Sequence, residues 1–260
     1  MANYSTLKGT EIQSLATDPY ASVTASGSWA SSNVLNDGRG GVGGAGIQTA
    51  ALCFAGNLNN PPSPLTNKTE SYNGSTWTEV ATLASARYEV GGVGATNTAA
   101  LCFGGNAPAA IAITEKWNGS SWTEVGDLSS GRSYIGSAGT NTAALCIAGL
   151  ISSPSLLVES YNGTAWSEVG ALNTARFGPG ATGSTTSAIA IGGAPNPSSN
   201  TDITESYNGS TWSEVGDLNT GRYGIGASGP DNTSALAFGG NNVPGSTGAT
   251  ESWNGTSWTE

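Results

Sequence analysis

Histidine is absent from this 260-residue chain, and charged residues of both signs are few. Without histidine there is no Ser-His-Asp or Cys-His arrangement for nucleophilic catalysis, and no Cys/His spacing for a metal ion. The 8 lysines and arginines form no cluster and are outnumbered by 18 acidic residues. Because phosphate groups are bound by basic patches, this composition argues against nucleic acid and anionic membranes as partners.

Long apolar runs are also missing. No stretch approaches the roughly 20 apolar residues of a membrane helix, so we expect no membrane insertion. The opening, MANYSTLKGTEIQSLATDP, lacks the apolar core of a secretory signal. No phosphate-binding loop is present either. The segment GRGGVGGAG at 38–46 is similar to a Gly-rich nucleotide loop, but it aligns with GRYGIGASG at 221–229 and is interpreted as a strand. No cofactor is expected.

Cysteine is scarce, and its three occurrences share one position in a repeated pattern. Cys53, Cys102 and Cys146 follow TAAL, and two further copies of the pattern have Ala190 and Ala237 there. A position that accepts Cys or Ala indicates a small buried apolar site. Equivalent sites on packed sheets lie about 10 Å apart, beyond the roughly 7 Å limit for a disulfide. We therefore expect inert core thiols in preference to redox or metal-binding roles.

Repetition is what the chain has in abundance. The segment ESYNGSTWTE at 70–79 returns four times with small changes, last as ESWNGTSWTE at 251–260. Its tryptophans are spaced by 45, 44, 46 and 46 residues. They are Trp77, Trp122, Trp166, Trp212 and Trp258. A fixed period of this size indicates one supersecondary unit repeated five times.

Each repeat has the residue types of four short β-strands. The first strand is rich in glycine, as expected where backbones pack around a narrow axis. The second is apolar at nearly every position, which indicates burial on both faces. An Asn-Gly pair between the third and fourth strands predicts a type I′ hairpin turn. The same Asn-Gly-Ser/Thr triplets match glycosylation sequons, but the turn accounts for all five. We predict an all-β fold, a five-bladed β-propeller of four-stranded antiparallel blades.

The repeat also resembles a known family. An Arg opens the first strand, Gly-Gly closes the second, Glu-x-Tyr/Trp lies in the third and Trp in the fourth, as in kelch and galactose-oxidase-like propeller repeats. The arginines are Arg39, Arg87, Arg132, Arg176 and Arg222, and the glutamates are Glu70, Glu115, Glu159, Glu205 and Glu251. Two copies depart from Gly-Gly, with Ala55-Gly56 and Ala148-Gly149. The resemblance implies a kelch-like fold but no one function, since the family includes enzymes and binding modules. Its copper oxidases use His ligands, which are missing here.

The domain prediction is a leader or attachment segment at 1–26 and the propeller at 27–260. Trp29 precedes Arg39 by the same 10 residues that separate each internal Trp from the next Arg. Gly27–Ser32 and Thr256–Glu260 therefore compete for the outer edge of the last blade. We favour the C-terminal strand, because a hairpin already ties it to its neighbour. The N-terminal strand would then lie elsewhere, against a partner or a neighbouring subunit.

The N-terminal segment carries a second resemblance. MANYSTLKGTEIQSLATDP is similar to the openings of tail or fibre-type virion proteins of marine bacteriophages. This resemblance implies a virion or extracellular location and contacts with other virion proteins through residues 1–36. The alternative is a flexible leader.

The recurrent Arg, Glu and Trp residues have structural explanations. Five Arg and five third-strand Glu in register predict one buried ion pair per blade. The five Trp are expected to wedge between blades. A second set, Glu79, Glu124, Glu168, Glu214 and Glu260, is expected to protect the outer edge. Glu89 alone breaks the pattern of its strand and could point into the channel, but one acid is not a catalytic pair.

Sequence variation is concentrated in one loop of each repeat. From the closing Gly to the next Glu the spacing is 14, 10, 10, 12 and 11 residues, whereas Glu to Trp is always 7. All five loops leave the second strand and must emerge on one face. Variation confined to one face is typical of a binding surface on a rigid scaffold, although drifting surface loops would look similar. The candidate binding residues are Asn59, Asn60, Asn106, Ser152, Asn196, Asn241 and Asn242.

Together these observations favour a non-enzymatic binding or structural propeller. The expected setting is a phage virion appendage that presents the variable-loop face to a host-surface glycan or protein. The alternative is a secreted bacterial propeller that acts as a lectin or hydrolyses glycans.

Overall fold

The computed structural model describes residues 31–58, 64–242 and 245–260. Their regular elements are all strands, and none of them forms a helix long and apolar enough to cross a membrane. The chain divides into Met1–Ser32 and Asn33–Glu260, and all the strands belong to the second unit. The predicted attachment segment 1–26 lies outside the described residues, as do Asn59 and Asn60.

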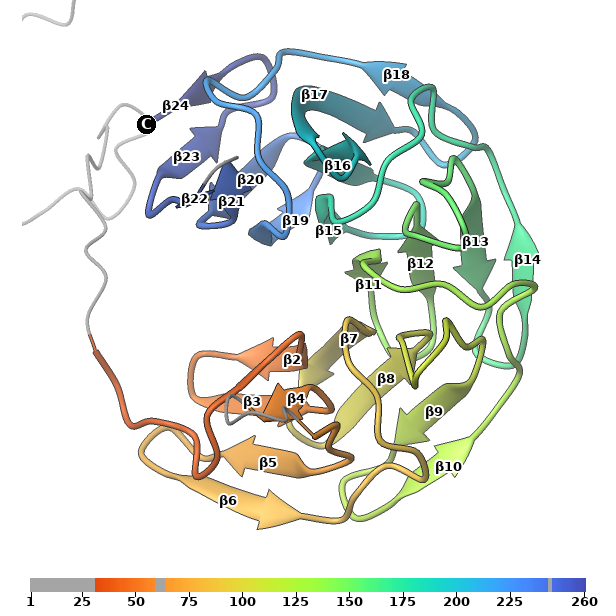
Figure 1. Cartoon of the computed structure of the whole chain (residues 1–260), viewed down its shortest axis with the longest axis vertical. Coiled ribbons are helices and arrows are strands. Elements are labelled where there is room, and N and C mark those ends of the chain that lie inside the picture. The colour runs from red at the N-terminus through yellow and green to blue at the C-terminus, as the bar shows by residue number, and fades with distance from the viewer. Residues whose placement is uncertain (1–30, 59–63, 243–244) are drawn as a thin grey trace, which may run out of the picture. The chain divides into compact units, whose positions relative to one another are not determined.

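Residues Asn33–Glu260 form a five-bladed β-propeller, as the repeats predict. Its five four-stranded antiparallel sheets follow one another around a central axis (Figure 1). From the axis outward, the first blade contains β2 (Gly43–Ile47), β3 (Ala50–Phe54), β5 (Thr69–Tyr72) and β6 (Trp77–Val80), and the second contains β7 (Gly91–Thr96), β8 (Ala99–Phe103), β9 (Thr114–Trp117) and β10 (Trp122–Glu124). The third blade contains β11 (Gly136–Gly139), β12 (Ala144–Ile147), β13 (Val158–Tyr161) and β14 (Trp166–Glu168), and the fourth contains β15 (Gly180–Gly183), β16 (Ala188–Asn196), β17 (Ser199–Tyr207) and β18 (Trp212–Glu214). The fifth blade contains β19 (Gly226–Asp231), β20 (Ser234–Phe238), β23 (Thr250–Trp253) and β24 (Trp258–Thr259).

The last blade is completed by the C-terminal strand, as favoured from the sequence. Trp258 of β24 pairs with Trp253 of β23, just as Trp166 pairs with Tyr161 in the third blade. Residues 27–30 of the competing N-terminal segment lie outside the described part of the chain.

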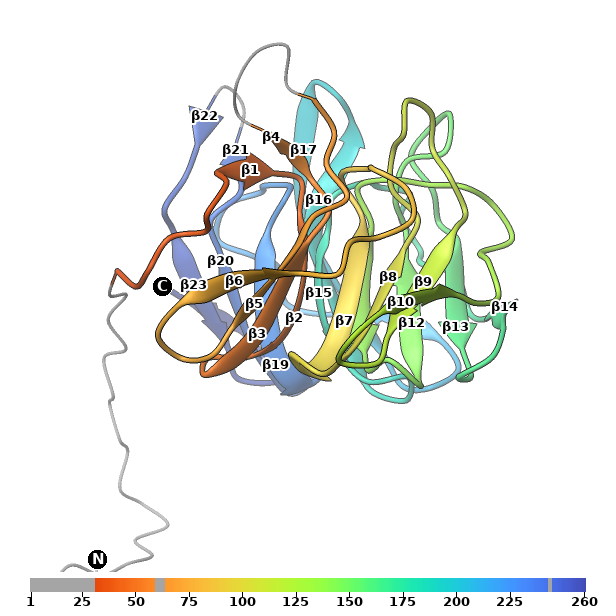
Figure 2. The ribbon, with the colours of Figure 1, turned by 90° about the horizontal axis from the view of Figure 1, so that it is seen from below.

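Two short pairs of strands extend the blades at one end of the molecule. β1 (Arg39–Gly40) pairs with β4 (Asn57–Leu58), and β21 (Asn241–Asn242) pairs with β22 (Gly245–Ser246). In the fourth blade, β16 and β17 extend as a long hairpin toward the same end (Figure 2). Except for β1, which precedes the first strand of its blade, these extensions belong to the connection between the second and third strands of a blade. The variable loops therefore share one face, which we call the loop face.

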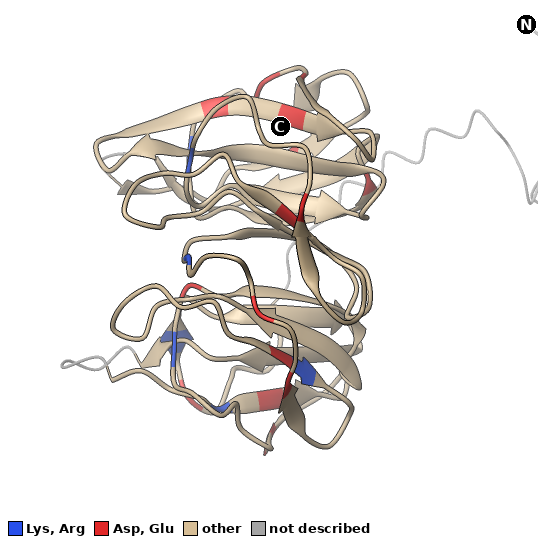
Figure 3. Cartoon of the chain, turned by 90° about the vertical axis from the view of Figure 1, so that its right-hand side faces the viewer, with Lys and Arg blue, Asp and Glu red and all other residues tan. Residues whose placement is uncertain are grey.

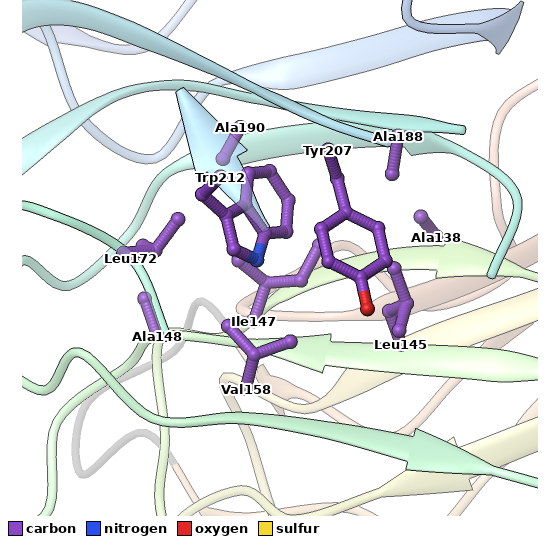
Figure 4. Packing of buried hydrophobic residues seen from close by; sticks show 10 residues of the cluster. All are labelled: Ala138, Leu145, Ile147, Ala148, Val158, Leu172, Ala188, Ala190, Tyr207 and Trp212. Carbon is purple, nitrogen blue, oxygen red and sulfur yellow. The ribbon is translucent and has the colours of Figure 1, made fainter. Parts of the chain in front are cut away.

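The core lies between blades, and the alternation of the second strand explains it. In β12, Leu145 and Ile147 face the fourth blade, where they pack on Ala188, Ala190 and its aromatic residues (Figure 4). The small residues of β12, Ala144 and Cys146, face the second blade. Large side chains on one face and small ones on the other let neighbouring sheets approach closely. Each fully buried Leu or Ile contributes about 1.5–3 kcal/mol.

Four of the five repeated tryptophans lie between blades, as predicted. The exception is Trp77, which packs on Tyr72 of its own blade and donates its indole N–H to the Asn33 carbonyl at 3.2 Å. The ring of Trp122 lies 5.0 Å from Phe54 of the preceding blade, and Trp166 lies 4.8 Å from Phe103. The indole N–H of Trp166 donates to Thr114 Oγ1 at 3.0 Å. Each of these rings therefore fastens a fourth strand to the previous blade through both packing and a hydrogen bond.

The cysteines have the buried, small-residue role expected of them. All three are free and buried, and burial raises their thiol pKa values, for Cys146 to about 11. The sulfur of Cys146 accepts a hydrogen bond from Arg132 Nε at 3.1 Å. Raised pKa values and burial both disfavour the reactive thiolate.

The predicted type I′ hairpin turn is wrong. Tyr72 pairs with Trp77, which leaves four residues in the loop, and only Gly74 has a positive φ, at 92°. The side-chain carbonyl of Asn73 accepts the N–H groups of Ser75 and Thr76, both at 2.9 Å. Asn73 thus closes the loop with its side chain and needs no left-handed backbone. The other four Asn-Gly pairs repeat this geometry.

Candidate binding face

The repeated Arg and Glu residues lie inside the blades, where each Arg forms an ion pair with a third-strand Glu. Several of the buried guanidinium nitrogens, such as Arg39 Nε and Arg176 Nε, have no hydrogen-bond partner among the described residues. The N–O distances are 3.2 Å for Arg39–Glu70, 3.1 Å for Arg87–Glu115, 2.7 Å for Arg132–Glu159, 2.9 Å for Arg176–Glu205 and 2.8 Å for Arg222–Glu251. These side chains are at most 1% exposed. The second carboxylate oxygen of each Glu accepts a backbone N–H from the connection that enters the blade, for example Ser129 at 2.8 Å. These residues hold the scaffold and are not available to a ligand.

Other charged side chains are sparse along the chain (Figure 3). The second set of glutamates, from Glu79 to Glu260, is exposed on the outermost strands or, for Glu260, directly after one. Among the described residues, no three or more His, Cys, Asp or Glu side chains are grouped as metal ligands.

The predicted binding residues within the described chain divide into three kinds. Asn106 and Asn241 brace loops: each forms a backbone bridge, with Tyr88 and Tyr223 respectively. Asn241 also accepts from Ser246 Oγ at 2.9 Å. Ser152 and Asn196 are exposed at loop tips. The fifth, Asn242, lines a pocket.

This pocket lies between the loops of the fourth and fifth blades. It has a volume of about 480 Å³ and is lined by Ser198, Ser199, Asn200, Asp202, Thr220, Gly221 and Asn242. Asn200 donates from Nδ2 to the carbonyl of Asn241 at 3.0 Å, while its buried Oδ1 has no partner among the described residues. Hydroxyls, amides and one carboxylate therefore converge on a space that an apolar ligand would fill poorly. We call this the loop pocket.

A chain of backbone hydrogen bonds circles the axis at the loop face. It runs from Gly41 through Glu89, Tyr134 and Gly178 to Gly224, and each N–H donates to the carbonyl of the preceding member at 2.6–3.1 Å. These five positions are equivalent in the five blades. Within the described chain, no corresponding bond leads from the Gly41 N–H back to Gly224.

Two of these five positions carry side chains where glycine would be the unstrained choice. All five residues have φ between 52° and 63°, in the left-handed region. Three are glycine, whereas Glu89 has φ 55° and Tyr134 has φ 52°. Such a backbone costs a non-glycine residue roughly 1–2 kcal/mol. Strain of this kind is often found at functional sites. Ala55 and Ala148 share it in the buried scaffold, whereas Glu89 and Tyr134 carry it at the loop face with partly exposed polar side chains.

Aromatic rings surround the pair. Phe177 lies 5.5 Å from Tyr134 and 5.7 Å from Tyr223, both in edge-on contact. Tyr88 precedes Glu89 directly, and its hydroxyl influences the pKa of Tyr134. We call Glu89, Tyr88, Tyr134, Phe177 and Tyr223 the channel mouth.

The channel mouth borders the central channel. The channel has a volume of about 730 Å³ and is lined by the inner strands and by the residues that follow the mouth positions, such as Ile135, Pro179 and Ile225. No charged side chain lines it.

The carboxyl group of Glu89 is held in a weakly solvated environment. Burial raises its pKa to about 7, and a hydrogen bond with the Tyr134 hydroxyl acts in the opposite direction. Its Oε2 is buried and has no hydrogen-bond partner among the described residues. Burial also raises the pKa of Tyr134. At neutral pH, Glu89 therefore exchanges between a neutral and a charged form.

Comparison with known proteins supports the fold and leaves the function open. No protein-family model and no curated protein matches the chain. Among solved structures, 218 chains match, and one of them is the structure of YjhT. YjhT superposes with a TM-score of 0.68 over 82% of this chain and 81% of its own, at 15% sequence identity. At this identity the likeness shows a shared fold alone.

Sequence reasoning missed most residues of both sites. The loop pocket adds Ser198, Asn200, Asp202 and Thr220 to Asn242, and their convergence depends on the hairpin extension of β16 and β17. The aromatic residues of the channel mouth did carry a signal: an aromatic residue lies one or two positions after the Arg in four of the five repeats.

Proposed function

We propose that this chain is a non-enzymatic binding propeller with kelch-like repeats, which presents its loop face to a glycan or protein on a host surface. The observation that supports this proposal most strongly is the loop pocket. It lies in the connections whose length varies between repeats, and the predicted residue Asn242 lines it together with Asn200 and Asp202. Hydroxyl and amide groups with one carboxylate match the hydrogen-bonding needs of a saccharide, so a host glycan is the favoured ligand.

A binding role also accounts for the distribution of charge. Glycan hydrolysis ordinarily uses two carboxylates that flank the scissile bond. The loop pocket has Asp202 alone, and the channel mouth has Glu89 alone. The glutamates that recur in every repeat are either paired inside the blades or exposed at the outer edge.

We place this propeller in a phage virion appendage, with a virion or extracellular location and contacts to other virion proteins through residues 1–36. This part of the proposal rests on the resemblance of the N-terminal residues. Neighbouring genes that encode tail proteins would support it, whereas a metabolic operon would argue against it.

A glycan array combined with a hydrolase panel tests the function. We expect specific binding by the wild type, at least tenfold weaker binding by Asp202→Asn and Asn242→Ala, and no turnover. Glu168→Gln, which removes an exposed carboxylate far from the pocket, serves as the control and should bind normally. If both pocket variants bound the glycan as tightly as the wild type, the loop pocket would not be the binding site. Turnover abolished by Glu89→Gln would favour a hydrolase instead.

A further inference from the structure

The channel mouth has a chemistry different from that of the loop pocket. It joins one carboxyl group to three phenols and a phenyl ring, and it carries no basic side chain. The described arginines are paired inside the blades, and no cation contributes to the pKa shift of Glu89. The backbone N–H groups of Glu89 and Tyr134 are used in the bonds that link the blades. An anionic ligand would therefore meet a carboxylate and few donors.

We propose that the channel mouth binds an organic ammonium group carried by a glycan, with Glu89 as its counter-ion and Tyr88, Tyr134 and Tyr223 as its aromatic walls. Aromatic faces and a nearby carboxylate are the combination that recognises alkylammonium ions. The three tyrosines are partly exposed at the loop face, so a ligand can reach their rings. This inference rests on the proposed function, because it names the chemical group that a bound glycan would present beside the loop pocket.

The position and backbone of Glu89 support its role as a counter-ion for a bound ammonium group. Its Oε2 lacks a partner within the described chain, although the side chain as a whole is partly exposed. The residue also adopts a strained backbone that glycine takes without cost in three other blades. A cation bound beside the exposed part of the side chain would offset the cost of burial and favour the ionised carboxylate.

Binding should consequently depend on pH in a defined direction. The titratable groups that interact with Glu89 are the phenols of Tyr88 and Tyr134. Burial raises the pKa of both above the ordinary value of 10, so they remain neutral below pH 9. Glu89 is then the group that changes charge between pH 5.5 and 8.5. Because only its ionised form pairs with a cation, affinity should be about tenfold lower at pH 6 than at pH 8.

The test uses NMR titration of the full chain with choline, whose charge does not vary with pH. Its neutral isostere, 3,3-dimethylbutan-1-ol, separates charge from shape. Titration with glucosamine tests whether an amino sugar binds. Titration with N-acetylglucosamine tests whether acetylation of the amine prevents binding. We expect choline and glucosamine to shift Tyr134 and Tyr223 signals more strongly at pH 8 than at pH 6. The neutral isostere and the capped sugar should leave those signals unchanged at the same concentrations.

Variants assign the effect to Glu89. Glu89→Gln should abolish the pH dependence and weaken choline binding at pH 8 about tenfold, with the spectrum of the folded protein retained. Tyr134→Phe removes the hydrogen bond that lowers the Glu89 pKa, so the midpoint of the pH profile should move upward. Glu168→Gln should behave as wild type.

Three outcomes would overturn the proposal: equal binding of choline and its isostere, a profile independent of pH, or binding unaffected by Glu89→Gln. A response to Nα-acetyl-lysine amide with none to choline or glucosamine would also overturn it, in favour of a protein ligand. Glycan binding that depends on Asp202 and Asn242 without any response at the channel mouth would leave the proposed function standing and reject this site alone.

Discussion

At the scale of single residues, Glu89 should make stability depend on pH. Its pKa in the folded protein, about 7, lies above its ordinary value of 4.5, so the folded state holds this proton more tightly than the unfolded state. Stability is therefore lost as pH rises from about 4.5 through 7. Glu89→Gln does not titrate, and it should be more stable than the wild type at pH 8.5 by roughly 1 kcal/mol and nearly equal at pH 5. Chemical denaturation of both proteins at both pH values measures these free energies of unfolding. The same stability difference between variant and wild type at pH 8.5 and at pH 5 would contradict the prediction.

Trp212 offers a second residue-scale test. The tryptophans Trp122, Trp166 and Trp258 each donate to a threonine hydroxyl of the preceding blade at 2.9–3.2 Å. Val158 occupies the threonine position before Trp212, and the buried indole N–H of Trp212 has no partner among the described residues. Val158→Thr should therefore stabilise the protein by about 1 kcal/mol, and Thr114→Val should destabilise it by about 1–3 kcal/mol. Thermal unfolding of both variants measures these changes. A loss of stability in Val158→Thr would contradict the prediction and would mean that the loss of valine packing outweighs the new hydrogen bond to Trp212.

At the scale of the strand and its connection, the buried ion pair of the third blade should contribute far more to the free energy of unfolding than the exposed glutamate of the same blade. Glu159 in β13 bonds Arg132 from one oxygen and the Ser129 N–H from the other, so it fixes both a strand and the segment that enters the blade. Glu159→Gln should cost about 3–5 kcal/mol, because it leaves a buried guanidinium unpaired. Glu168→Gln, on the exposed β14, should change stability by less than about 0.5 kcal/mol. Urea unfolding of the two variants should separate them clearly; comparable losses would place the pair at the surface.

Strand elements were largely predictable from sequence, because their signals are local and repeated five times. The alternation of large and small residues in β12 identifies a strand buried on both faces, and the Arg–Glu register anticipates the ion pairs. The turn type was not predictable from Asn-Gly alone. The pairing of Tyr72 with Trp77 sets the loop length, and the side chain of Asn73 then replaces the positive φ that a type I′ turn requires. The loop pocket could not be predicted, because it depends on how far β16 and β17 continue past the blade.

At the scale of the whole molecule, the blade interfaces are not equivalent. Leu236 of the fifth blade is 41% exposed, whereas its counterparts Leu101 and Leu145 are fully buried. The backbone bonds around the axis likewise join successive blades, with none described between Gly224 and Gly41. Leu145→Ala should cost about 3–5 kcal/mol and Leu236→Ala less than about 1.5 kcal/mol. Equal costs in denaturant unfolding would show that the first and last blades pack as tightly as the others.

The central claim is that a uniform scaffold presents its function on one face. The Arg and Glu residues of the scaffold form ion pairs inside the blades, whereas Asn200 and Glu89 lie at the loop face, each with a buried oxygen that has no hydrogen-bond partner among the described residues. Hydrogen–deuterium exchange of the whole chain, with and without the glycan that the array selects, tests this most directly. We predict protection of segments 196–203 and 241–242 at the loop pocket, with no change in the Asn-Gly hairpins at the opposite end of the blades. Protection of those hairpins, with the loop segments unchanged, would contradict the account.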